Sequence, residues 1–219
     1  MAARDVLKEL ATRFTQAGGA PVDARAAGGV DVAKRVRAGE DVDVVVLASN
    51  VIDELIAEGH LAGTRVDLVR SGVGIAAPSG RARPAVATEQ EVRAAVLAAR
   101  TVSFSTGPSG TYLQKLFERW GIFAAVKERI IVPSPGVPVG SLVAEGRAEL
   151  GFQQLSELIN VAGVEVLGPL PESIQSMTLF SGGVAKTSAN PSSARALLES
   201  MTAPATAPVK QRFGMEAVA

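Results

Sequence analysis

A run of six small residues, Ser105-Thr106-Gly107-Pro108-Ser109-Gly110, joins an apolar stretch of the chain to an amphipathic one. The run carries no charge, no metal ligand and no nucleophile paired with a base, so its chemistry must come from the backbone. Apolar residues recur at i, i+4 spacing from Tyr112 to Trp120 and predict a helix over 111–120, with Ser109 as its N-cap. The first N–H groups of such a helix lack helical partners, and the helix dipole favours an anion beside them.

Two kinds of hydrogen-bond donor are expected at this helix start. They are the backbone N–H groups of Gly110, Thr111 and Tyr112 and the hydroxyl groups of Ser105, Thr106, Ser109 and Thr111. Because a glycine allows a ligand to approach the backbone closely, we expect a bulky residue in place of Gly110 to weaken anion binding without unfolding the protein.

Two further helix starts have the same character. Gly28-Gly29 precedes Val30 and a short helix predicted over 30–38, and Gly136–Gly140 contains Val137 and a proline, Pro138, that suits a first helical turn. Any one of these loops could be an ordinary strand-to-helix turn. Three of them after strands favour a ligand site, because ligands of open α/β sheets bind beyond the carboxyl ends of the strands. None matches a P-loop or a dinucleotide fingerprint, so nucleotide binding is not expected.

Apolar strands and helices alternate along the whole chain, which predicts an α/β fold with mainly parallel sheets. The predicted strands are 21–27, 41–49, 65–78, 101–105, 129–133, 149–152, 164–170 and 177–187. The predicted helices are 4–16, 30–38, 50–58, 88–99, 111–120, 139–145 and 153–161, with two more at the end of the chain.

Composition excludes several classes of function. The 219 residues include 22 Lys and Arg and 22 Asp and Glu, and this zero net charge argues against nucleic acid as a partner. Cysteine is absent and His60 is the single histidine, so neither a disulfide framework nor a thiolate or histidine-rich metal site is possible, and no cofactor is expected. No apolar run reaches the length of a membrane span. The chain opens with an amphipathic pattern rather than a signal peptide, which predicts a cytoplasmic protein as written, or a periplasmic one if a leader was removed.

Three stretches in this order carry a resemblance to a known family: AAGGVDVAKRVRAGEDVDVVVLAS, STGPSGTYLQKLFERWGI and VAEGRAELGFQQLSEL. The chain, over roughly residues 4 to 215, resembles the molybdate-binding-protein-like branch of the type II periplasmic solute-binding proteins, aconitate-isomerase-like relatives included. The resemblance implies two α/β lobes with helices on both sheet faces and a small anion in the cleft between them. Lobe one would comprise 1–74 and 183–219, and lobe two 75–182, with crossing strands at 67–78 and 177–186.

The resemblance also implies which positions contact the ligand. The first-lobe anion loop of the family, Ser-Ser-Gly, falls on Ala27-Gly28-Gly29, where only backbone donors remain. The second-lobe helix start falls on 108–111, the next loop falls near Gly136-Val137, and a ligand-binding tyrosine of the family falls on Gln154. Gln153 and Gln154 carry amides that can hydrogen-bond a carboxylate or a hydroxyl.

In one respect the sequence departs from the family pattern, which has a strand before the first helix. Here Met1-Ala2-Ala3 enters that helix almost at once. Unpaired backbone groups inside a sheet would each cost about 1–3 kcal/mol. We therefore expect water, a shifted strand or the strand of a neighbouring chain to close the gap, and the last of these would make a homodimer through a sheet edge.

The resemblance leaves three functions open: a solute-binding protein that delivers an anion to an ABC-type membrane importer, an isomerase that moves a proton on a small carboxylic acid, and a cytoplasmic anion sensor. An isomerase needs an acid–base group at the ligand. The candidates are Asp31, Lys34, Arg35, Glu157, His60 and Arg70. Each also has an ordinary structural explanation: dipole compensation for Asp31 and His60, a solvated face for Lys34 and Arg35, and an ion pair for Arg70 and Glu157.

Overall fold

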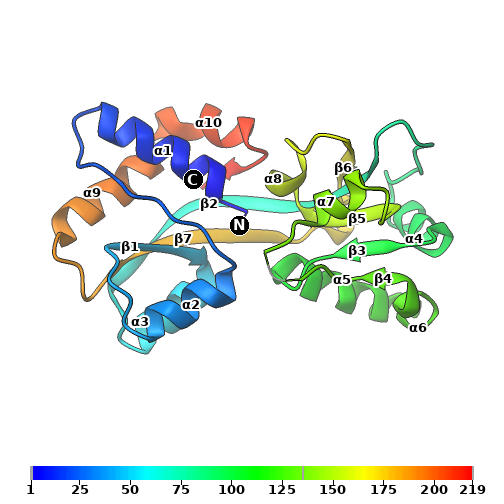
Figure 1. The fold of residues 1–219 in the computed structure, drawn as a ribbon, viewed down its shortest axis with the longest axis horizontal. Coiled ribbons are helices and arrows are strands. Elements are labelled where there is room, and N and C mark those ends of the chain that lie inside the picture. The colour runs from blue at the N-terminus through cyan, green and yellow to red at the C-terminus, as the bar shows by residue number, and fades with distance from the viewer. Residues whose placement is uncertain (1, 135, 219) are drawn as a thin grey trace. The chain divides into compact units, whose positions relative to one another are not determined.

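The computed structural model describes residues 2–134 and 136–218, and the chain forms two compact units. Unit 1 comprises Met1–Arg70 and Thr178–Ala219, and unit 2 comprises Ser71–Met177. The chain passes from one unit to the other within strand β2 (Leu61–Pro78) and at the start of strand β7 (Met177–Ala185) (Figure 1).

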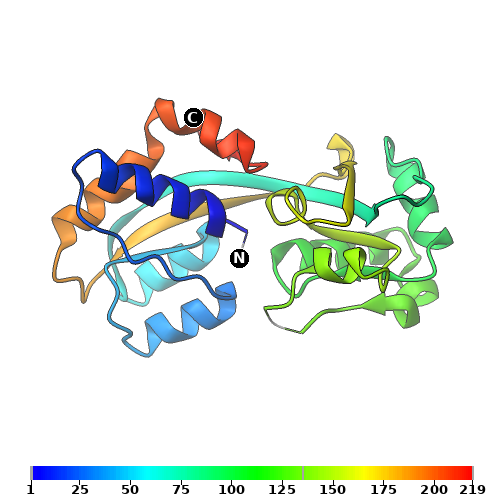
Figure 2. The same cartoon turned by 45° about the horizontal axis from the view of Figure 1, so that its top comes forward.

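Unit 1 is a twisted sheet with helices on both faces. Its strands are β1 (Val44–Ala48), most of β7, the first part of β2 and β8 (Glu216–Ala217), in the order β1-β7-β2, with β8 also pairing with β2. Its helices are α1 (Arg4–Gln16), α2 (Gly29–Arg37), α3 (Ser49–Ala57), α9 (Pro191–Thr202) and α10 (Ala207–Arg212), with a 3-10 turn at Pro204–Thr206. Helices α1, α9 and α10 cover one face, and α2 and α3 cover the other (Figure 2).

Unit 2 is built around a second sheet in the order β2-β5-β3-β4, with β6 on the other side of β2. Its further strands are β3 (Val102–Phe104), β4 (Ile130–Ile131), β5 (Leu150–Gln154) and β6 (Val164–Pro169). Its helices are α4 (Glu89–Ala98), α5 (Pro108–Arg119), α6 (Phe123–Val126), α7 (Val139–Ala144) and α8 (Leu155–Leu158), with 3-10 turns at Lys127–Arg129 and Glu172–Ile174.

Aromatic packing fixes α5 against the sheet of unit 2. Phe117 of α5 is fully buried, lies edge-on to Phe104 of β3 and to Phe152 of β5, and stacks on Trp120. The apolar rows that predicted this helix therefore form its buried face, as periodicity requires. This packing holds the second half of α5 against β3 and β5.

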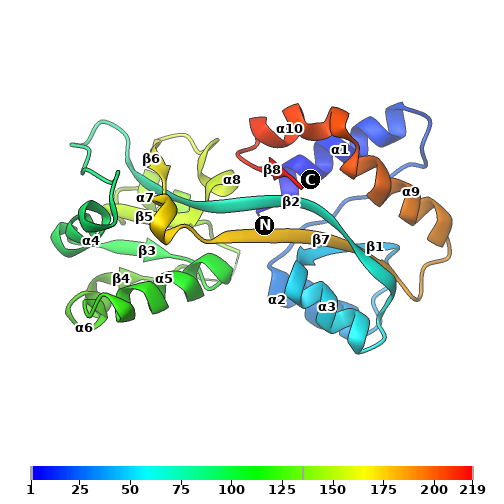
Figure 3. The same cartoon turned by 180° about the vertical axis from the view of Figure 1, so that it is seen from behind.

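The mixed α/β fold is confirmed, whereas the expectation of mainly parallel sheets is wrong. Strand β3 runs parallel to β4 and β5, but β2 is antiparallel to β5, β6 and β8, and β1 is antiparallel to β7. Alternation of strands and helices along a sequence does not determine which strands become neighbours. Here the long strand β2 pairs with strands from distant parts of the chain, and β5, β6 and β8 are antiparallel to it (Figure 3).

Two local expectations also fail. Residues 21–27 belong to no helix or strand, although their sequence suits a strand. Gln153 and Gln154 lie on β5 rather than on a helix, because β5 continues two residues beyond the predicted end and α8 begins only at Leu155.

Within the described part of the chain, no helix is long and apolar enough to span a lipid bilayer.

Candidate functional site

The three parallel strands of unit 2 end at the same edge of its sheet. Val102 of β3 lies opposite Ile130 of β4 and opposite Leu150 of β5, so the three carboxyl ends are aligned. The Ser105–Gly107 loop follows β3, Pro133-Ser134 and Gly136-Val137 follow β4, and Gln153-Gln154 ends β5. The structure thus brings together the three sequence-predicted groups that belong to unit 2, at the kind of edge where α/β sheets bind ligands.

Helix α5 starts earlier than its sequence suggested, and this changes which groups are donors. Gly107 is the N-cap and Pro108 is the first helical residue, so Ser109 is not the N-cap. The Thr111 N–H, expected to be available, donates to the Gly107 carbonyl at 3.1 Å. Tyr112 lies far enough into the helix to bond to Pro108 in the regular pattern.

Two backbone N–H groups therefore remain at the start of α5, those of Ser109 and Gly110. Neither forms a hydrogen bond with the described residues. Ser109 is only 3% exposed, and its hydroxyl likewise has no hydrogen-bond partner in the described chain. Thr106 and Thr111 are exposed at the same helix start. The Ser109 hydroxyl and the two unpartnered N–H groups give this helix end three donors for an acceptor ligand.

The packing of the loop requires a glycine at position 110, independently of any ligand. A Cβ atom at this position would lie 1.5 Å from the carbonyl oxygen of Ser105, because the loop folds back against the helix start. The expectation that a bulky residue at Gly110 would leave the fold intact is therefore wrong. Ser105 is also used structurally, since its Oγ accepts the Gly107 N–H at 3.2 Å.

The two glutamines at the end of β5 point to opposite faces of the sheet, as adjacent strand residues do. Both are 3% exposed. Gln153 Oε1 accepts the N–H of Val139 at 3.0 Å and thereby satisfies the first donor of α7. Its amide nitrogen is the part left to interact with a ligand. Gln154 is the residue from which α8 starts, directly beside β3 in the sheet order.

The third predicted helix start, that of α7, has fewer free N–H donors than its sequence suggested. Pro138 is the N-cap of α7 rather than a residue of its first turn, and the first N–H of α7 is already bound by Gln153. Gly136 adopts a φ of 85°, which a residue with a side chain rarely does, and forms a turn in which the Val137 N–H donates to Ser134. Gly136 and Val137 are exposed at the sheet edge, but their loop is mainly a turn.

The glycine loop of unit 1 precedes α2, which begins at Gly29, one residue before its predicted start. Gly28 is the N-cap of α2, Gly29 is its first residue and Val30 is 68% exposed. Asp31 lies in the first turn, and its Oδ2 is 3.3 Å from the point where a Cβ on Gly28 would be. An acidic side chain already occupies the positive end of this helix, which reduces its attraction for a second anion.

The charged candidates in unit 1 have structural partners or are solvated. Arg70 Nε donates to Glu216 Oε2 at 2.8 Å, so the ion-pair explanation holds for Arg70. Lys34 and Arg35 are exposed on α2, and Arg35 pairs with Glu40.

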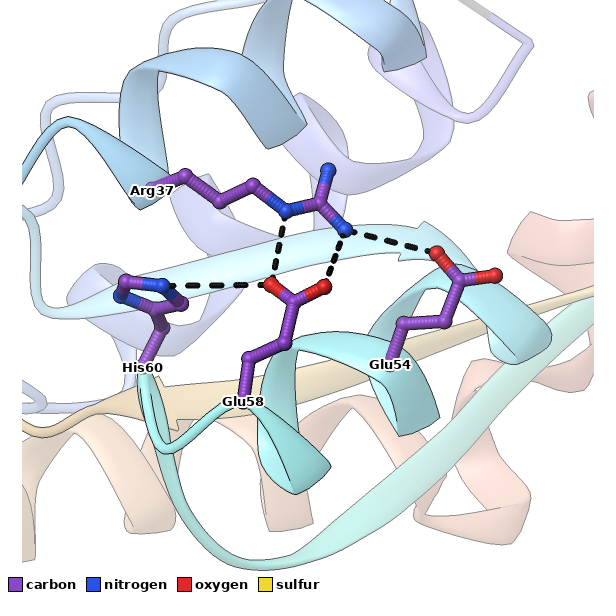
Figure 4. Close-up of polar contacts among 4 residues, drawn as sticks. All are labelled: Arg37, Glu54, Glu58 and His60. Carbon is purple, nitrogen blue, oxygen red and sulfur yellow. Dashed lines mark hydrogen bonds and ion pairs between the residues drawn. The ribbon is translucent and has the colours of Figure 1, made fainter.

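His60 belongs to a cluster at the ends of α2 and α3 (Figure 4). Arg37 donates to both carboxylate oxygens of Glu58, at 2.7 and 2.8 Å, and reaches Glu54 at 3.4 Å. His60 Nε2 lies 3.9 Å from Glu58 Oε2. The hydrogen bond from Arg37 is the main cause that lowers the pKa of Glu58. The cluster is a surface ion-pair network, which His60 joins through Glu58.

Sequence reasoning missed one polar group near the edge. Ser156 Oγ, on α8 two residues after Gln154, is buried without a hydrogen-bond partner among the described residues. Glu157 follows it and is half-buried. Both residues stand in the stretch that carried the resemblance and in the helix predicted over 153–161, where Glu157 was a candidate; Ser156 was missed because a serine in a helix carries no signal of burial. The described residues contain no group of acidic or histidine side chains that could hold a metal ion.

Comparison with known proteins gives a consistent picture. The family described as bacterial extracellular solute-binding protein matches residues 1–216. A protein of Pseudomonas sp. named aconitate isomerase is 36% identical over 173 residues, which are 77% of this chain and 65% of that protein. The match thus spans less than two thirds of the relative's length.

Solved structures share the fold at low sequence identity. The periplasmic molybdate-binding protein of Azotobacter vinelandii superposes with a TM-score of 0.80 at 20% identity, covering 100% of this chain and 96% of the other. The substrate binding protein of an ABC transporter from Agrobacterium tumefaciens gives 0.72 at 17% identity, covering 97% and 76%.

Proposed function

Because the chain belongs to the family of bacterial extracellular solute-binding proteins, we propose that it binds a small anion and delivers it to an ABC-type membrane importer. The proposed contacts in unit 2 are Thr106, Ser109, Gly110, Thr111, Gly136, Val137, Gln153 and Gln154. The proposed contacts in unit 1 are Gly28, Gly29 and Val30. In keeping with the family description, we place this function outside the cytoplasmic membrane.

The observation that carries the proposal is that the hydrogen-bond donors of Ser109 have no partner in the described chain. Ser109 is 3% exposed, and its hydroxyl, its N–H and the N–H of Gly110 have no hydrogen-bond partner in the described chain, at the positive end of a 12-residue helix. Buried donors normally have partners. A ligand that supplies acceptor oxygens and negative charge would satisfy all three donors at once.

The sheet edge in unit 2 offers neutral donors rather than cations. Residues 105–110 and Gln153-Gln154 contain no Lys, Arg or His. Backbone and amide donors suit the planar oxygens of a carboxylate as well as a tetrahedral oxyanion. We favour a small carboxylic acid, because the relative that is 36% identical is named for aconitate, a tricarboxylate.

Calorimetry on the intact protein tests this function with aconitate, citrate, sulfate and molybdate as probes. Ser109→Ala should weaken the best ligand about tenfold or more, since a hydrogen bond to a charged group contributes about 1.5–3 kcal/mol. Ser192→Ala is the matched control: Pro191-Ser192 begins α9 as Pro108-Ser109 begins α5, but Ser192 is exposed. Equal affinity of wild type and Ser109→Ala, or no binding of any probe, would contradict the proposal.

An isomerase is the second candidate, and the same relative favours it. Moving a proton requires an acid–base group at the substrate. In unit 2, Glu157 is the carboxylate closest in sequence to the proposed contacts, and it is half-buried on α8. Incubation with aconitate in D₂O, followed by NMR, would show deuterium incorporation if the protein is an isomerase, and Glu157→Gln should abolish it. Binding of aconitate without deuterium incorporation would reject the isomerase and retain the solute-binding function.

A further inference from the structure

Gln153 has only the nitrogen end of its side-chain amide available to a ligand at the carboxyl end of β5. Its Oε1 accepts the Val139 N–H at 3.0 Å. An N–H group bonds to the oxygen of an amide and never to its NH₂ nitrogen, so this contact determines which way the amide is turned. The other end, Nε2, forms no hydrogen bond with the described residues and is not completely buried. The side chain therefore offers a ligand a donor rather than an acceptor.

Packing between β5 and α7 holds the amide in this orientation. Gly151, two residues before Gln153, faces the same side of the strand. A Cβ atom on Gly151 would collide with Val143 and would lie 3.0 Å from Val139 Cγ1, so α7 lies directly on the strand. Gln153 is 3% exposed and Val139 is completely buried. Turning the amide would therefore leave a buried N–H without an acceptor, which is destabilising.

Ser105 repeats the arrangement on the neighbouring strand. It directly follows Phe104 of β3, which lies opposite Phe152 of β5. Ser105 and Gln153 thus hold corresponding positions on the two strands. Ser105 Oγ accepts the Gly107 N–H at 3.2 Å, which leaves its hydroxyl hydrogen for another acceptor. In both side chains a backbone N–H of the protein binds the oxygen, and the hydrogens remain for a ligand.

We propose that Gln153 determines the specificity of the anion site, and that Val139 positions its amide so that the site accepts an ionised carboxylate and rejects the corresponding carboxamide. This inference rests on the proposed function. A carboxylate has acceptor oxygens and no hydrogen, so it can face Gln153 Nε2, the Ser105 hydroxyl and the donors of α5. A carboxamide brings an NH₂ group that would meet another donor. Turning the Gln153 amide to receive it would break the contact with Val139.

Calorimetry on the full chain with trans-aconitate and its monoamides measures this selectivity as a ratio of dissociation constants. Val139→Pro is the key variant, because proline has no N–H. It should fold, since Val139 is the first residue of α7, where proline is accepted, and Pro138 before it already has an extended ψ of 144°. The Gln153 amide can then turn without leaving a donor unpaired, and the ratio should fall about 5- to 100-fold.

Val139→Ala is the matched control for this variant. It also removes side-chain packing but keeps the N–H, so its ratio should equal that of wild type. Gln153→Glu is an independent variant, which keeps an oxygen for the Val139 N–H and places a second oxygen where Nε2 was. Its affinity for trans-aconitate at neutral pH should fall about tenfold or more. Gln114→Glu adds the same charge at an exposed position of α5 and should bind like wild type.

The inference and the proposed function fail in different ways. Wild type that binds trans-aconitate and its monoamides equally well would overturn the inference and leave anion binding in place. The same conclusion would follow if Val139→Pro and Val139→Ala changed the ratio equally, or if Gln153→Glu bound trans-aconitate like wild type. If wild type binds neither compound, the inference is overturned, and titrations with sulfate and molybdate decide whether anion binding itself stands.

Discussion

Gln153 Oε1 accepts the backbone N–H of Val139 at 3.0 Å, and this contact joins the end of β5 to the start of α7. Both residues are buried. A side chain predicted to bind the ligand thus also completes the fold of unit 2, with its oxygen engaged by α7 and its amide nitrogen remaining for other contacts. Replacing Gln153 therefore affects stability as well as binding.

Gln153→Met should destabilise the protein by about 1–3 kcal/mol, because it leaves the buried Val139 N–H without an acceptor. Urea unfolding measures the change. Gln114→Met, at an exposed position of α5, is the control and should stay within about 0.5 kcal/mol of wild type. If Gln153→Met unfolds at the same urea concentration as wild type, water or a shifted side chain satisfies Val139, and the contact is not structural.

Gly110→Ala should reduce stability by about 2–4 kcal/mol, since the new methyl group would collide with the Ser105 carbonyl and the loop must move. Thermal unfolding in the absence of ligand measures this directly. Gly107→Ala is the neighbouring comparison: its Cβ would lie 3.4 Å from Ser105 Oγ, so only the weaker N-cap preference, below about 1 kcal/mol, is lost. A Gly110→Ala variant that melts like wild type would show that the loop adapts freely.

The helices with strong apolar periodicity were predictable, as α1 shows: residues 4–16 were expected and Arg4–Gln16 is observed. Periodicity locates the buried face but not the cap, which is why α5 starts at Pro108 and the donors at its start shift from Thr111 to Ser109. The strand predicted over 149–152 is present, but its end was placed too early, because pairing with β2 extends β5 through Gln153 and Gln154. Strand direction was wrongly predicted because it depends on neighbours that no local pattern specifies.

Asp67 on β2 should give unit 1 an acid-sensitive contribution to stability. Burial alone would raise its pKa, but hydrogen bonds from Arg65 Nε at 2.8 Å and Ser181 Oγ at 2.6 Å outweigh burial and hold the pKa below the usual range. An acid whose pKa is depressed in the folded state stabilises the protein above its unfolded pKa of about 3.9, and this stabilisation disappears as the pH falls through the folded value.

Asp67→Asn should therefore lower stability by about 1 kcal/mol near neutral pH, a modest value because the ion pair is partly exposed. The variant should also lose less stability than wild type between about pH 5 and about pH 2. Urea midpoints across this range provide the measurement. Asp23→Asn, in an exposed pair with Arg25, is the comparison. Parallel pH profiles for wild type and Asp67→Asn would show that Asp67 is not the origin of the acid sensitivity.

Lys210 of α10 is only 1% exposed, and its ammonium group has no ion pair or hydrogen bond within the described residues. Burial lowers its pKa. Between the folded pKa and the unfolded value of about 10.4, the unfolded chain binds more protons than the folded one, so wild-type stability rises with pH in that window.

Lys210→Met should remove this dependence and raise stability near neutral pH by about 1–2 kcal/mol, as replacement of a buried charge by an apolar group of similar size often does. The two proteins should converge in stability toward about pH 10, while Lys8→Met, at an exposed position of α1, should match wild type throughout. A Lys210→Met variant that is less stable than wild type near neutral pH would mean that the buried amine makes a net favourable interaction in the folded state.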